Sequence, residues 1–108
     1  MDTLSQTRGD TVSYTFQRLD MNGDVIFTTP EALFFTLKTN FETNKIIVQK
    51  DLSKMNMDST GTWRFTLEHE DTKDLPYSNY VFDIQVTESG AVSTIAKGIL
   101  RLTQEATW

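Results

Sequence analysis

The sequence contains no cysteine among its 108 residues. This absence excludes disulfide bonds, thiolate zinc sites, iron–sulfur clusters and cysteine nucleophiles, so stability must come from packing and strand pairing. The chain has a single histidine, His69, whereas a zinc site usually needs two or more His or Cys ligands. A solvated strand end is therefore the favoured interpretation of His69, and we expect no metal site.

Clustered positive charge is also missing. The ten Lys and Arg residues are scattered among fifteen acids, which gives a net charge of −5 and argues against nucleic-acid binding. No glycine-rich phosphate loop is present. The carboxylates Glu68 and Asp83 fall on the polar faces of expected strands, where water keeps them from forming an acid–base pair. We therefore expect no enzyme and no cofactor.

Long apolar runs are absent as well. No stretch approaches the length that spans a bilayer, so we expect no membrane insertion. Residues 1–6 lack the basic start and apolar run of a signal peptide. We therefore expect synthesis in the cytoplasm without export.

The clearest pattern in the chain is a pair of alternating strands on either side of an acidic, proline-containing corner at 71–79. Trp63, Phe65 and Leu67 alternate with polar residues in the first strand, and the same period of two recurs at 80–86. A period of two indicates one buried and one wet face, which is typical of an antiparallel sheet covered on one side.

Shorter strands at regular spacing fill the rest of the chain. The expected strands lie at about 3–7, 11–19, 32–39, 46–48, 62–68, 80–87, 91–96 and 99–102. Seven to nine such strands favour an all-β, immunoglobulin-like antiparallel β-sandwich. We expect residues 1–8 to form an N-terminal arm or edge strand, 9–103 a single domain, and 104–108 a tail.

Two details of the strands are less regular. The segment 50–58 fits a helical turn, but an irregular crossover with one strand pairing suits an all-β chain better. Lys97 and Gly98 are the expected site of a β-bulge. In the strand at 32–39, Thr36 is expected to face outward, and Phe34 breaks the alternation and is expected to be partly exposed or to lie under a loop.

Two turns match short functional motifs. Arg8-Gly9-Asp10 spells the integrin-binding tripeptide, and the acids of 20–24 resemble a fragment of a calcium loop. The calcium pattern lacks the other spaced oxygens and the final bidentate Glu. Ordinary turn chemistry is favoured for both.

Tyr80 and Leu75 have the spacing of a tyrosine corner, in which a Tyr hydroxyl bonds to the backbone a few residues upstream and pins an inter-sheet crossover. Plain burial of Tyr80 in the core is the alternative. Three aromatic residues are expected to be exposed and to make contacts, namely Phe34, Tyr77 and the terminal Trp108.

Several stretches together resemble a known family. They are Gly9 to Phe16, Gly61 to Leu67, and Leu75 to Val86 followed by Gly90 and the strand ending at Leu102. Together they are similar to the small immunoglobulin-like domains of bacteriophage and prophage tail and baseplate proteins, in particular the N-terminal domain of phage baseplate upper proteins. The resemblance covers about 9–103 and consists of fold-level motifs without catalytic residues.

The resemblance implies a non-enzymatic virion component of a tail or baseplate, made in the cytoplasm of the host bacterium. Its partners would be other virion proteins and copies of itself. The alternative is a carbohydrate-binding module for host-surface glycans, in which Tyr77 would stack on a sugar and Asn79 would bind its hydroxyls. A small hydrolase is a third hypothesis, and it would need a carboxylate pair.

Overall fold

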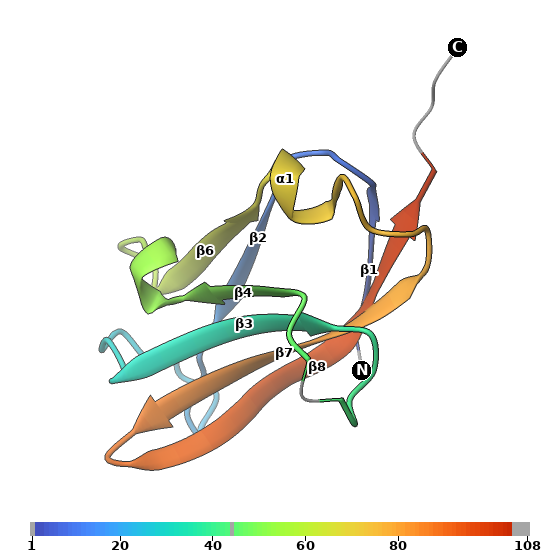
Figure 1. Cartoon of the computed structure of the whole chain (residues 1–108). Coiled ribbons are helices and arrows are strands. Elements are labelled where there is room, and N and C mark those ends of the chain that lie inside the picture. Colours follow the sequence, from blue (N-terminus) through green and yellow to red (C-terminus); the bar gives the residue numbers. More distant parts are fainter. Residues whose placement is uncertain (1, 44, 105–108) are drawn as a thin grey trace.

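The structure, a computed structural model, describes residues 2–43 and 45–104, which form eight strands and two single-turn helices (Figure 1). The elements in chain order are β1 (Asp2–Thr7), β2 (Val12–Gln17), β3 (Ala32–Lys38), β4 (Val48–Asp51), η1 (Leu52–Lys54), β5 (Asn56–Met57), β6 (Thr62–Leu67), α1 (His69–Thr72), β7 (Asn79–Glu88) and β8 (Ala91–Thr103).

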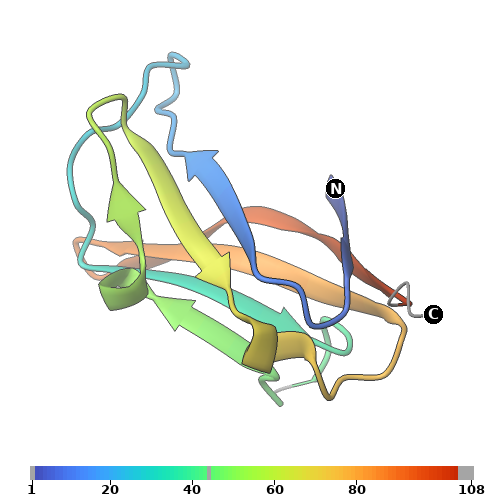
Figure 2. The same cartoon turned by 90° about the horizontal axis from the view of Figure 1, so that it is seen from above.

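The strands form two sheets that face each other. The larger has the order β1-β8-β7-β3-β4, and the smaller has the order β2-β6-β5 (Figure 2). The all-β sandwich expected from the alternation is confirmed, and so is its strand count. The two strongly alternating strands, β6 and β7, lie in different sheets, so the acidic corner between them is a crossover and not a hairpin.

One pairing departs from the expected antiparallel pattern. β1 is an edge strand, as expected, but it runs parallel to β8, with Leu4 opposite Leu100. The turn after β1 leads into the other sheet, and Gly9 allows it with a φ of 83°. Because β2 leaves for the second sheet, β1 has no neighbour in sequence to pair with and lies along β8.

The core lies between the sheets and is built around Phe35. Its ring centroid is 4.5 Å from that of Phe65 across the sandwich and 5.7 Å from that of Phe82 on the neighbouring strand. Alternation places these side chains inward, as the sequence predicts. The buried apolar residues are Leu33, Phe35, Leu37, Val48, Met55, Trp63, Phe65, Leu67, Tyr80, Phe82, Ile84, Val86, Leu100 and Leu102.

Thr36 is on the outer face of β3, as expected, but it is buried there, and Gln49 Nε2 from the neighbouring β4 donates a hydrogen bond to its Oγ1 (3.2 Å). One expectation for the middle of the chain is wrong. The strand expected at 46–48 begins only at Val48.

The segment 50–58 contains both a helical turn and a short strand pairing, the two structures considered for it. η1 provides the helical turn, where the Oδ1 atom of Asp51 accepts the Ser53 amide (3.1 Å), and β5 provides a short pairing with β6. β8 is one continuous strand. Its bulge lies at Ile95, where the partners of Ile84 and Gln85 are Ala96 and Thr94, and not at Lys97 and Gly98.

Candidate functional site

The β7–β8 hairpin leaves part of a strand uncovered. Its turn residues Ser89 and Gly90 have φ values of 51° and 79°, as in the tight hairpin that Thr87-Glu88-Ser89-Gly90 predicts. β1 pairs with β8 only from Gly98 to Thr103. Within the described residues, nothing pairs with the outer edge of Ala91–Ala96, a segment that we call the β8 edge.

Apolar side chains flank the β8 edge. Leu19 and Ile26, from the long connection between β2 and β3, line a hollow of about 440 Å³ together with Ser93 and Ile95 of the β8 edge. Leu19 is 57% exposed and Ile95 40% exposed. We call the β8 edge together with Leu19 and Ile26 the contact surface.

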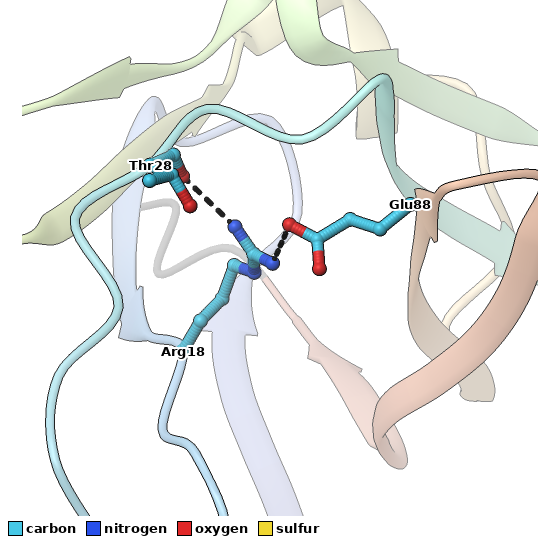
Figure 3. A network of polar contacts seen from close by, with 3 residues as sticks. All are labelled: Arg18, Thr28 and Glu88. Carbon is cyan, nitrogen blue, oxygen red and sulfur yellow. Dashed lines mark hydrogen bonds and ion pairs between the residues drawn. The ribbon is translucent and has the colours of Figure 1, made fainter.

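A buried arginine joins the β2–β3 connection, which contains Leu19 and Ile26, to the β7–β8 hairpin (Figure 3). Arg18, at the end of β2, is 4% exposed, and its guanidinium pairs with the carboxylate of Glu88 at the end of β7. A second guanidinium nitrogen donates to the carbonyl oxygen of Thr28 at 3.0 Å. Since a buried charge must be paired and hydrogen-bonded, this network fixes the β2–β3 connection beside the hairpin.

The opposite end of the sandwich has the hydrogen bond of a tyrosine corner. The Tyr80 hydroxyl donates to the carbonyl oxygen of Pro76 at 2.7 Å, so the acceptor is Pro76 and not Leu75. Burial raises the pKa of the Tyr80 hydroxyl above its usual value. Leu75 packs against the core, and its carbonyl accepts from Arg8 Nη1 at 3.3 Å.

Tyr77 is exposed, as expected of a contact residue, but one face of its ring is occupied. The Arg8 guanidinium lies 4.1 Å from the ring centroid, a cation–π arrangement. Asn79 Oδ1 accepts a hydrogen bond from Arg101 Nε at 3.3 Å. A sugar could therefore stack only on the other face of Tyr77.

The structure does not bring the expected contact residues together. Phe34 is half-buried on the outer face of β3, opposite Gln85 near the end of β7, whereas Tyr77 precedes the first residue of that strand. Trp108 lies outside the described residues.

The sequence analysis did not identify Leu19 and Ile95 as exposed apolar residues beside an open strand edge. For Ile95, the available signal was the uncharged run between Gly90 and Lys97, which contains three β-branched residues.

His69 is exposed just after the end of β6, as expected, but it is the first residue of α1. Its Nδ1 lies 2.6 Å from the carbonyl oxygen of Gly9, and Thr72 Oγ1 accepts the Gly9 amide at 2.9 Å. Lys50 Nζ pairs with Asp71 Oδ2 at 2.8 Å and ties α1 to β4. These contacts hold the chain where it crosses between the sheets.

Both motif-like turns are turns, as expected. The Asp10 amide donates to the Thr7 carbonyl (3.2 Å), and the Gly23 amide donates to the Asp20 carbonyl (3.0 Å). Asp20 Oδ1 accepts the amides of Asn22 and Asp24 at 2.8 and 3.0 Å. That oxygen therefore caps the turn.

A second hollow, of about 300 Å³, opens between the sheets and is lined mainly by aromatic rings, including Tyr14, Phe16 and Phe65. Burial raises the pKa of the Tyr14 hydroxyl, which donates to Gln6 Oε1 at 2.5 Å.

Glu68 caps α1 and Asp83 lies in the middle of β7, so they form no carboxylate pair.

In residues 2–43 and 45–104, no three His, Cys, Asp or Glu side chains gather closely enough to hold a metal ion. The same part of the chain contains no helix that is long and apolar enough to cross a membrane. No protein-family model matches the sequence, and a search of curated proteins finds no significant relative.

Proposed function

We propose that this chain is a non-enzymatic structural component of a tailed phage or prophage virion, located in the tail or baseplate, and that it acts through protein–protein contacts. The resemblance of its strand and turn motifs to immunoglobulin-like tail domains supports this role, and the two-sheet sandwich is compatible with it. After synthesis in the host cytoplasm it would join other virion proteins and copies of itself.

The observation that carries the proposal is the contact surface. Soluble domains usually protect unpaired strand edges with charges, prolines, bulges or covering loops. Here Ala91–Ala96 contain no charge and no proline, and the bulge at Ile95 is the one such feature within the segment. Every residue from Ala91 to Ile95 is exposed. Leu19 extends the exposed apolar area beside it. Such a surface is suited to a neighbouring protein, and repetition in a particle would strengthen weak single contacts through multivalency.

Immunoelectron microscopy tests the proposal directly. Antibodies against the purified chain would be applied to tailed particles induced from the strain that carries the gene. We expect gold labels at the tail or baseplate, and no labels on particles from a strain with the gene deleted. Particles without label, in a preparation whose dissociated proteins lack the chain by mass spectrometry, would refute a virion role.

Glycan binding is the second candidate function, because Tyr77 is 47% exposed and Asn79 lies close in sequence. A glycan array with the wild-type chain and with Tyr77→Ala separates the two proposals. The assembly role predicts no binding by either protein. Binding by the wild type that Tyr77→Ala abolishes would establish the glycan function instead.

A further inference from the structure

The β8 edge is open on one side along a single, well-defined stretch. β7 pairs with it on one side, and β1 begins its pairing on the other side only at Gly98. Figure 1 shows the β7–β8 hairpin projecting past the end of β1. The backbone amides and carbonyls on this edge are available to another strand.

We propose that two copies of this chain pair antiparallel through the β8 edge, around a twofold axis close to Ser93 and Thr94. The inference deepens the assembly function proposed above, on which it rests, by naming the partner as a second copy. The two larger sheets would then join into one continuous sheet through β8 of each copy.

The position of β1 decides the direction of pairing. In a parallel, in-register pairing, the second β8 would continue alongside Gly98–Thr103, where β1 already lies. In an antiparallel pairing the second β8 runs in the opposite direction, so its continuation passes the turn at Ser89 and Gly90 and does not meet β1. Only the antiparallel arrangement avoids the clash, and a twofold axis closes it at two copies.

The charge next to the β8 edge favours the same arrangement. Lys97 directly follows the segment, whereas Glu88 lies across the hairpin on β7, opposite Ala91, and already pairs with Arg18 of its own chain. Parallel, in-register pairing would set the Lys97 side chains of the two copies against each other, and antiparallel pairing separates them. Leu19 and Ile26 beside the edge, and Ile95 within it, would contact the same residues of the second copy.

Sedimentation equilibrium of the full chain tests the proposal, because it measures the mass in solution. Protein concentrations should reach about 1 mM, since a dimer with a higher dissociation constant would have a binding free energy of less than about 4 kcal/mol. We expect a dimer of twice the 12.4 kDa chain mass. Ile95→Lys should raise the dissociation constant at least about tenfold, because it removes an exposed apolar side chain that the dimer would bury and adds a charge near the axis.

Ile46→Lys is the matched control, since Ile46 is similarly exposed (47% against 40% for Ile95) but lies in the connection between β3 and β4. It should leave the dimer unchanged, and circular dichroism confirms that both variants fold.

Hydrogen exchange provides a second readout that does not depend on a variant. The amides of the β8 edge should exchange more slowly as the protein concentration rises, while those of the β3–β4 connection should not change. A monomer at all concentrations would overturn the self-pairing and leave the virion role to the microscopy. A dimer that Ile95→Lys does not weaken would overturn the β8 edge as its interface while keeping assembly itself.

Discussion

The ion pair between Arg18 and Glu88 should contribute to stability far more than its place near the surface implies. Glu88→Gln removes the negative charge beside the buried guanidinium, while the new amide oxygen and the Thr28 carbonyl still accept its hydrogen bonds. Hydrogen bonds between charged groups contribute about 1 kcal/mol or more beyond neutral ones. The Glu88 side chain is 47% exposed, so water screens the pair, and we expect a loss of about 1–2 kcal/mol.

Urea unfolding at pH 7 measures this loss, and thermal unfolding should show a fall in Tm of about 5–10 °C. Arg18→Met removes the buried charge and keeps much of the side-chain volume, so it should cost about 1 kcal/mol. The double variant should cost no more than Arg18→Met alone, because without Arg18 the exposed carboxylate has nothing left to neutralise. Glu42→Gln, on an exposed loop, is the matched control and should change stability by less than about 0.5 kcal/mol.

Additive losses in the two single variants would contradict the coupling between Arg18 and Glu88. If the double variant loses the sum of the two single losses, Arg18 and Glu88 contribute independently and the pair does not hold the β2–β3 connection. A loss below about 0.5 kcal/mol for Glu88→Gln would mean that water solvates the guanidinium in solution.

Two further perturbations follow from the structure. Tyr80→Phe should cost about 1–2 kcal/mol at pH 7, because it removes the donor to the Pro76 carbonyl. Since burial raises the pKa of Tyr80 in the folded state above 10.0, the stability from this group is present below about pH 10 and lost above it. Urea unfolding at pH 7 and pH 11 should show a smaller alkaline loss for Tyr80→Phe than for the wild type, and equal losses would contradict the argument. Gly61→Ala should cost about 2–4 kcal/mol, because φ is +79° and the new Cβ would meet Val25 Cγ1 at 2.4 Å. Gly90→Ala, at the same φ with nothing within 4 Å, should cost only about 1 kcal/mol by the same measurement, and equal costs would mean that Val25 moves aside.

The accuracy of the sequence interpretation follows the range of the interactions. The inward faces of β3, β6 and β7 were predictable, because alternation is a property of neighbouring residues. The hairpin turn at Gly90 and the tyrosine-corner hydrogen bond were predictable for the same reason, since each depends on a spacing of a few residues.

The candidate site was much less predictable. Phe34 and Tyr77 were selected for their expected exposure, which is a local property, but nothing in the sequence says that they lie at different parts of the sheet. The outer edge of Ala91–Ala96 is unpaired because β1 begins to pair with β8 only at Gly98, and β1 is about ninety residues away in sequence. A local pattern cannot reveal which strand edge stays uncovered.

An all-β sandwich without disulfides, and most of the residues that fill its core, could be inferred from the sequence. The folded chain was needed to reveal that β1 runs parallel to β8, that Thr36 is covered, and that Arg18 is buried against a carboxylate seventy residues away. The difference arises because a period of two fixes the face on which a side chain lies. Strand partners and buried charges depend instead on how distant segments pack in space.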